Sequence, residues 1–340
     1  MRTRTLEQVP SLPGLYSKAL GRTAQAAAPA MLARKPQPTQ LPEVRYAVDE
    51  VPVDAGHLGE YQRLLGEPGS DDLPAGYVHV LAFPLAMAVM VRPDFPLPVL
   101  GMVHVANRVD QHHQLHADDV LRIRAWAEGL RAHRSGTQVD LVVEVAGQEG
   151  PEVAWRGVST YLAKGTRVPG LALAEPAGES SGRSAADSSN STERSAGSAT
   201  GSGGSAEGSG GQPLTSSPAE TEADLPEQTA MWQVDKQTAR AYAAISGDRN
   251  PIHTSAVGAK AFGFPRAIAH GMYTAARALS SVGTARGSAF TWEVRFAKPV
   301  LLPSSVAFGL NRRESGGYDY AGWRPSDGRV NFSGSVRPAP

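Results

Sequence analysis

Residues 246–272 combine side-chain types and spacings that could perform acid–base chemistry. Asp248 and His253 lie five residues apart, and the asparagine and proline between them favour a stiff turn. A carboxylate and an imidazole held on one stiff loop can share a water molecule and move its protons. His270 follows 17 residues after His253, and Gly271 next to it opens a stretch of small residues with helical character. A backbone N–H at the start of a helix can hold the oxyanion that such proton transfers create.

The two blocks Ser246–His253 and Ala269–Met272 resemble, in order and spacing, the signature of a known enzyme family. This family is that of the MaoC-like (R)-specific enoyl-thioester hydratases and 3-hydroxyacyl-thioester dehydratases. The resemblance covers roughly residues 230–336 and includes Val294-Arg295-Phe296-Ala297-Lys298-Pro299-Val300, where the family has a strand. It implies the hotdog fold, in which an antiparallel sheet wraps around a central helix.

The resemblance also implies roles for individual residues. Asp248 and His253 are expected to be the catalytic pair, and Gly271 is expected to offer its backbone N–H to the thioester carbonyl. Some members of the family carry a serine eight residues after this glycine, but that position is Leu279 here, with Ser280 beside it. The sequence therefore supports the carboxylate–imidazole pair and leaves an auxiliary hydroxyl without a clear counterpart.

Other interpretations of the same residues stay open. An ordinary surface turn with an Asx-type hydrogen bond would also contain Asp248 and His253, but the second block at its family distance favours catalysis. Asn250 either touches the water and substrate or braces the loop, and bracing is the preferred interpretation. His270 belongs to the predicted substrate-binding block. A buried structural histidine is its expected role, because the chemistry needs the Gly271 backbone more than the imidazole.

The histidines raise the question of a metal site. Asp248, His253 and His270 are suitable ligand types. Their spacing matches no helix-based zinc motif, and the chemistry needs no metal, so the sequence predicts neither a metal nor another cofactor. A second histidine cluster lacks zinc-site spacing as well and is predicted to be a polar turn between two strands. It consists of His112, His113 and His116.

Composition narrows the class of protein. The 340 residues are enough for two domains with their own cores. Lys plus Arg and Asp plus Glu each number 33, so no global charge favours nucleic acid or an anionic membrane. The chain has no cysteine, which excludes disulfides and thiolate chemistry. No stretch reaches the ~18 apolar residues that a membrane span needs. We expect a cytoplasmic protein.

The chain divides into four segments. Residues 1–40 form a basic N-terminal arm with a short surface helix around Gly14–Leu20. Residues 41–171 and 226–340 are the two folded halves. Residues 172–225 between them are rich in Ser, Gly and Ala and almost free of large apolar residues. Such a segment cannot bury enough apolar surface to offset its ordering entropy, so it is predicted to be a disordered linker.

The two halves look like divergent copies of one unit, which predicts an α+β double hotdog: two antiparallel sheets, each wrapped around a central helix, within one chain. The helices expected in the first half are Leu58–Leu65 and Leu85–Val91, and in the second half Lys236–Ser246 and Ala269–Ser281. The strands expected in the first half are Gly101–Val109, Asp119–Ala132, Thr137–Val145 and Val153–Leu162. Those expected in the second half are Phe290–Phe296, Ser305–Arg312, Tyr318–Arg324 and Val330–Val336.

The copies are not chemically equivalent. Where the second half has Asp248, the first has Glu67, and no histidine follows in register. Where the second half has His270-Gly271, the first is expected to have Phe83-Pro84, and proline has no N–H to donate. The second half is therefore predicted to be catalytic and the first degenerate, forming a pseudo-dimer with it and shaping the acyl pocket.

The resemblance implies reversible hydration of a trans-2-enoyl thioester to an (R)-3-hydroxyacyl thioester in fatty acid metabolism. The substrate is expected to be carried on coenzyme A or on an acyl carrier protein. Lys260, Arg266 and Lys298 could bind the phosphates of either carrier, but an ordinary role as solvated surface charges explains these residues equally well. Two other functions are kept: a non-catalytic acyl-binding or assembly subunit of a dehydratase complex, and an acyl thioesterase. A homodimer is possible. The sequence does not decide which of the catalytic pair moves which proton.

Overall fold

A computed structural model describes residues 1–27, 38–147, 152–173 and 225–339. The predicted disordered linker lies outside the described residues, apart from its two ends. None of the helices in these ranges combines the length and apolar character needed to cross a bilayer.

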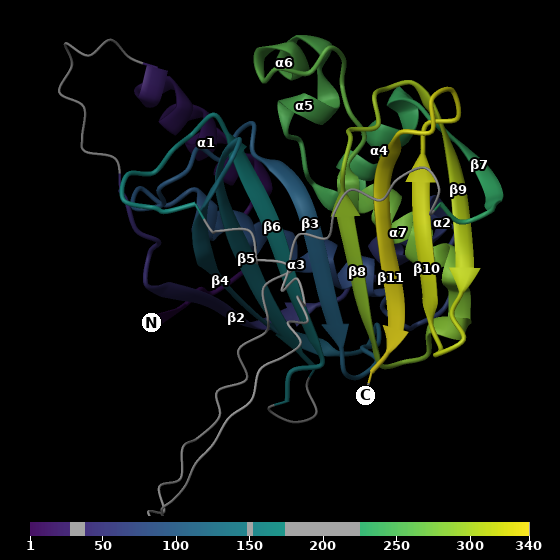
Figure 1. The fold of residues 1–340 in the computed structure, drawn as a ribbon. Coiled ribbons are helices and arrows are strands. Elements are labelled where there is room, and N and C mark those ends of the chain that lie inside the picture. Colours follow the sequence, from purple (N-terminus) through teal and green to yellow (C-terminus); the bar gives the residue numbers. More distant parts are fainter. Residues whose placement is uncertain (28–37, 148–151, 174–224, 340) are drawn as a thin grey trace, which may run out of the picture. The chain divides into compact units, whose positions relative to one another are not determined.

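The described strands form one sheet of 11 strands, which Figure 1 shows from its broad side. In spatial order they are β1 (Arg2–Thr5), β2 (Val44–Pro52), β4 (Val120–His133), β5 (Gly136–Ala146), β6 (Trp155–Lys164), β3 (Val103–Gln111), β8 (Phe290–Phe296), β11 (Val330–Pro338), β10 (Tyr318–Trp323), β9 (Ser304–Arg312) and β7 (Gln228–Val234). The eight strands expected from the sequence are all present. Strands β1, β2 and β7 were not predicted.

The two halves meet where β3 pairs antiparallel with β8, so the sheets expected for the two halves lie side by side and continue into one. Ala106 lies opposite Arg295 and Arg108 opposite Glu293 in this ladder, and the last two side chains form an ion pair of 2.5 Å. The two blocks expected at equivalent places, 103–109 and 294–300, therefore meet at the junction. In a single hotdog the edge strand of the sheet needs a partner from another chain, whereas here β3 and β8 of the same chain pair with each other.

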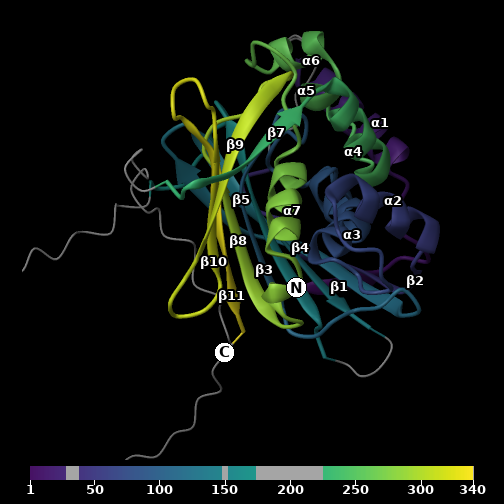
Figure 2. The same cartoon turned by 90° about the vertical axis from the view of Figure 1, so that its right-hand side faces the viewer.

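The helices lie together on one face of the sheet, as Figure 2 shows. They are α1 (Leu12–Ala27), α2 (Ala55–Leu65), α3 (Ala75–Met90), α4 (Lys236–Ser246), α5 (Pro251–Thr254), α6 (Ala256–Ala261) and α7 (Gly271–Val282), with the 3-10 helix η2 (Gly283–Arg286) after α7. Helices α3 and α7 are the central helices of the two halves. Together with the joined sheet, they give the double-hotdog architecture that the sequence predicts.

Local sequence explains the bounds of α4. Asp235 caps its first turn by accepting from the Thr238 N–H, and Gly247 ends it with φ of 67°, a left-handed conformation that favours glycine. Tyr242, on its inner face, is 2% exposed. In the first half, α2 ends in the same way at Gly66, with φ of 74°. The residue that follows Gly66 is Glu67, so this acid does occupy the position of Asp248.

The prediction that Phe83-Pro84 is the counterpart of His270-Gly271 was wrong. Helix α3 begins at Ala75, after Pro74, and Phe83-Pro84 lies inside it rather than at its start. Most side chains of α3 are buried, and this packing carries the helix through the proline. Pro74-Ala75 therefore corresponds to His270-Gly271, and the first half has not lost a backbone donor through proline.

What the first half does lack is an imidazole beside its acid. The side chain of Glu67 is 3% exposed, and its carboxylate pairs at 3.1 Å with Arg286 from η2 of the second half. Burial raises the pKa of Glu67, and the arginine opposes that effect. The first half thus holds a buried ion pair between the two halves where the second half holds Asp248 and His253.

Residues 1–27 of the N-terminal arm form a strand and a helix, and they lie closer to the site than expected. Strand β1 extends the sheet by pairing parallel with β2. The helix predicted around Gly14–Leu20 is α1, and it is not only a surface helix, because Leu15 and Ala19 are 4% and 2% exposed. This helix brings Tyr16 to Asp248.

Candidate active site

The loop between α4 and α5 fixes the carboxylate of Asp248. Its Oδ1 accepts a hydrogen bond of 3.1 Å from the Asn250 backbone N–H and one of 2.5 Å from the Tyr16 hydroxyl. The Asn250 side chain caps α5 by accepting from the Ile252 N–H, with Pro251 at the first helical position. Asn250 also lines the cavity described below, so it combines loop bracing with access to a ligand.

His253, on α5, faces the other oxygen of this carboxylate. Its Nε2 lies 3.9 Å from Asp248 Oδ2, too far for a direct hydrogen bond. Its Nδ1 lies 2.9 Å from the Ile268 carbonyl oxygen, which only accepts, so Nδ1 carries the proton and Nε2 presents a lone pair toward Asp248. A water molecule with hydrogen bonds of about 2.8 Å to each atom would fit across the gap.

His270 supports the pair from behind. Its ring stacks on that of His253 with centroids 3.9 Å apart, and its Nε2 donates to the Asp248 carbonyl at 2.9 Å. The residue is 2% exposed. Burial and the neighbouring His253 lower the pKa of His270 to about 3, so its imidazole stays neutral at ordinary pH. The imidazole is thus buried and held by the Asp248 main chain.

Electrostatics fix the resting protonation of Asp248 and His253. Burial alone would raise the pKa of Asp248, but the two histidines and the bonds from Tyr16 and the Asn250 N–H outweigh it and lower the pKa. Burial lowers the pKa of His253 against the opposing effect of Asp248. A carboxylate and a neutral imidazole therefore face each other at neutral pH.

The arrangement of the two histidines does not suit a shared metal ion. Ligand atoms of Asp248, His253 and His270 do lie within 4.8 Å of one another. The two rings are stacked with an interplanar angle of 25°, however, so their in-plane lone pairs run side by side rather than converging on one point. Nε2 of His270 is also committed to the Asp248 carbonyl.

Gly271 lies at the first position of α7, where a backbone N–H has no acceptor within the helix. The residue lines the same cavity as Asp248 and His253. A Cβ at this position would lie 3.0 Å from the ring of Phe296, so glycine lets this ring close over the start of the helix. Neither Leu279 nor Ser280 lines the cavity, whereas Thr274, which donates to the Gly271 carbonyl at 2.7 Å, does.

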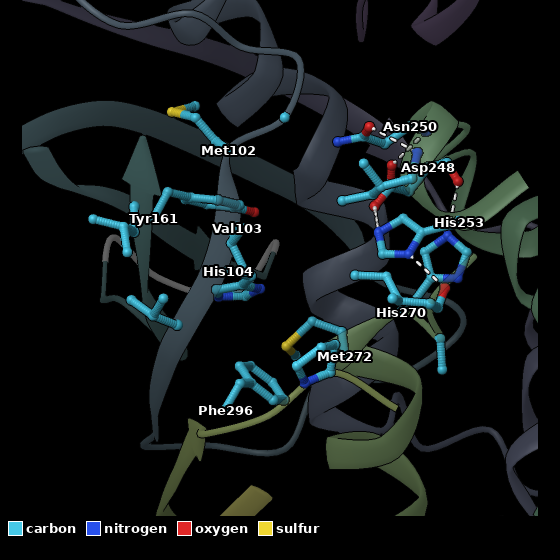
Figure 3. Close-up of a pocket in the computed structure, with 18 of the residues that line it drawn as sticks. Met102, Val103, His104, Tyr161, Asp248, Asn250, His253, His270, Met272 and Phe296 are labelled. Carbon is cyan, nitrogen blue, oxygen red and sulfur yellow. Dashed lines mark hydrogen bonds and ion pairs between the residues drawn. The ribbon is translucent and has the colours of Figure 1, made fainter. Parts of the chain in front are cut away.

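These groups open onto a cavity of about 410 Å³. Figure 3 shows Asp248, Asn250, His253 and His270 gathered on one side, with His104 and Tyr161 of the first half across the space from them. The His104 ring stacks on that of Tyr161 at 4.6 Å and lies 5.3 Å from that of Phe296. Farther into the first half, the lining is mostly apolar and includes Met87, Met90, Val99 and Leu100.

The sequence predicted that the first half shapes the pocket, but not which polar residues it contributes. These are His79 on α3, His104 on β3 and Tyr161 on β6, which are far from Asp248 in the chain. Burial lowers the pKa of His79 to about 4 and that of His104 to about 3, so both imidazoles are neutral. The one sequence signal was that His104 belongs to the block equivalent to residues 294–300.

The predicted cations separate into two groups. Lys298 is exposed and lines the cavity, as does Lys164 at the end of β6, so both lie at its mouth. Lys260 and Arg266 are exposed and do not line it. The second histidine cluster is apart from the site, with His116 and His113 paired to Asp72 at 3.0 Å and to Glu152 at 3.7 Å.

A family model, a curated relative and solved structures all relate this chain to MaoC-like dehydratases. Residues 216–319 match a family model described as the MaoC-like domain. The chain is 32% identical to 3-hydroxyacyl-thioester dehydratase X of Mycobacterium tuberculosis, over 94% of this chain and 97% of that protein. A crystal structure of HtdX from the same organism superimposes with a TM-score of 0.66 at 29% identity, covering 87% of this chain and all of that one. A MaoC-like dehydratase from Phytophthora capsici shares the fold, with a TM-score of 0.59, 17% identity, and coverage of 88% and 97%.

Proposed function

The chain belongs to the MaoC-like family of 3-hydroxyacyl-thioester dehydratases, and we propose that it interconverts trans-2-enoyl and (R)-3-hydroxyacyl thioesters in fatty acid metabolism. The observation that carries this proposal is the 3.9 Å gap between Asp248 Oδ2 and His253 Nε2 on the wall of the cavity. A water molecule in that gap is the nucleophile in one direction and the leaving group in the other.

The resting protonation states suggest which side chain acts as the base. Asp248 already accepts two hydrogen bonds on Oδ1, which weaken it as a base. His253 presents a free Nε2 lone pair, and its imidazolium form would be stabilised by Asp248 and by the Ile268 carbonyl. During hydration, His253 takes a proton from the water as the oxygen bonds to C3. The same proton then passes to C2 on the same face, because the ionised Asp248 has none to give.

The thioester oxygen becomes negative as the water adds, and the Gly271 N–H is the proposed donor for it. An amide at the first position of a helix combines a free donor with the positive end of the helix dipole. One such donor is often worth about 3–4 kcal/mol of barrier. The proposed reaction uses no metal ion and no other cofactor.

The first half is proposed to contribute binding and not chemistry. Its apolar side chains, such as Met87 and Leu100, are suited to the acyl chain. Lys164 and Lys298 at the mouth are suited to phosphates of coenzyme A or of a phosphopantetheine arm. One chain then carries its own partner half, and neither a homodimer nor a second subunit is required for activity. The cytoplasmic location stays a prediction from the sequence.

The direct test is hydration of crotonyl-CoA by the purified single chain, followed by loss of the enoyl thioester absorbance and by chiral analysis of the product. We expect (R)-3-hydroxybutyryl-CoA, at a rate unchanged after treatment with EDTA. Release of free thiol from a saturated acyl-CoA, without hydration, would instead identify a thioesterase. Absence of both activities until another hotdog protein is added would identify a non-catalytic subunit.

Gly271 allows the backbone donor to be tested apart from side-chain bulk. Gly271→Ala adds a Cβ near Phe296 but keeps the N–H, whereas Gly271→Pro adds bulk and removes the N–H. Proline is tolerated at the first helical position, and His270 before it already has the extended backbone (φ −63°, ψ 129°) that proline demands. We expect kcat to be at least ~100-fold lower for the proline variant than for the alanine variant.

The comparison depends on both variants being folded, which circular dichroism and thermal unfolding would establish. Equal kcat values for the two folded variants would mean that the Gly271 N–H does not bind the reacting oxygen.

A further inference from the structure

Helix α1 from the N-terminal arm is fixed across the two halves of the chain. At its start, Leu12 packs so closely on Gly247 that a Cβ at Gly247 would lie 2.2 Å from Leu12 Cδ1. Toward its end, Arg22 donates to main-chain carbonyls after α3 in the first half, those of Arg92 and Phe95. The helix therefore bridges the turn that carries Asp248 and the end of the first half's central helix, and Figure 2 shows it on the outer side of the helical layer.

This placement puts one hydroxyl on the catalytic carboxylate. Tyr16 donates to Asp248 Oδ1 at 2.5 Å, and the Asn250 N–H donates to the same oxygen at 3.1 Å. Oδ2 remains directed at His253 Nε2 across 3.9 Å. Two donors on one oxygen fix the rotation of the carboxylate, so the second oxygen is held at the edge of the gap that a water would occupy.

Electrostatics keep the Tyr16 hydroxyl in its donor form. Burial and the nearby Asp248 carboxylate raise the pKa of Tyr16 far above its usual value. The hydrogen bond in turn contributes to the lowered pKa of Asp248, against the effect of burial. The other titratable groups that face Asp248 are His253, His270, His79 on α3, His104 on β3, Tyr161 on β6 and Tyr242 on α4.

We propose that Tyr16 is a positioning residue of the reaction, which holds the Asp248 carboxylate in its ionised, productively rotated form while leaving Oδ2 free for the water. The inference rests on the proposed hydratase function. It assigns the N-terminal arm a part in catalysis, and it makes the geometry of the Asp248–His253 pair depend on three segments: α1, the loop after α4, and α5.

The test is Tyr16→Phe, which removes only the hydroxyl and keeps the ring. In crotonyl-CoA hydration we expect kcat to fall about 10-fold or more with KM changed less than about twofold, because the lost bond is one to a charged group. Without this donor, the Asp248 carboxylate is less stabilised, so its own pKa rises and it raises the pKa of the base His253 more strongly. The acid limb of the kcat profile reports protonation of that base and should therefore shift to higher pH, a change that a merely structural role would not cause.

Ser17→Ala is the matched control, since Ser17 is an exposed neighbour on the same helix whose hydroxyl bonds the Pro13 carbonyl. It should leave kcat and the pH profile as in the wild type. A Tyr16→Phe protein with an unchanged kcat and acid limb would overturn the proposal, and so would an increased kcat, which would mean that the tyrosine blocks the site. Failure of the wild type itself to hydrate enoyl thioesters would instead reject the proposed function.

Discussion

Replacing His253 by alanine or Asp248 by asparagine is expected to lower kcat at least ~100-fold, the usual scale for a positioned acid or base. In the proposed reaction His253 accepts and returns the proton, and Asp248 stabilises the imidazolium that forms. Both side chains lie on a loop and a four-residue helix rather than in the main core. We therefore expect melting temperatures within a few degrees of the wild type, measured by thermal unfolding beside steady-state kinetics.

The Asp248→Asn change is the milder one for the fold, because the asparagine oxygen can still accept from Tyr16. The His253→Ala change also removes the donor to the Ile268 carbonyl, at a cost of about 1 kcal/mol. His116→Ala serves as a control, since His116 also has an acidic partner but is half-exposed and lies outside the cavity. Near-normal turnover in either site variant would show that the pair is misassigned.

Residues 225–340 expressed alone are expected to aggregate or to homodimerise, with little activity. Without the first half, β8 loses its partner β3 and becomes an open sheet edge. Arg286 loses the buried carboxylate of Glu67, and the Ile245 carbonyl loses its 2.8 Å hydrogen bond to His57. The wall of the cavity opposite the catalytic pair is also removed, together with Tyr16.

Co-expression with residues 1–175 as a separate chain should restore a soluble, active heterodimer, because the strand pairing and the ion pair described above are made by residues of the two halves themselves. Size-exclusion chromatography with light scattering, run beside the hydration assay, measures both outcomes. Glu67→Gln in the co-expressed first half is a graded control, which should weaken assembly by leaving Arg286 without its charged partner. A monomeric and fully active 225–340 fragment would contradict this account of the two halves.

The sequence alone determined the parts of this protein that depend on neighbours in the chain. Helix α4 has the bounds that its cap at Asp235 and its terminal Gly247 predict, because both signals act within one turn. The eight predicted strands follow from alternation of apolar residues over short runs. Asp248, His253 and His270 were identified as a group because the loop and the start of the next helix both fall within 27 consecutive residues, 246–272.

Tertiary structure decided the features that depend on residues far apart in the chain. Periodicity and capping cannot show that Tyr16 bonds Asp248, 232 positions away, or that Arg286 takes the place of an imidazole beside Glu67. They also placed the start of α3 wrongly, because a proline predicts a helix end locally while burial on all sides sustains the helix. The joining of β3 to β8 into one sheet, and the wall that faces the catalytic pair, likewise arise only when the two copies pack together.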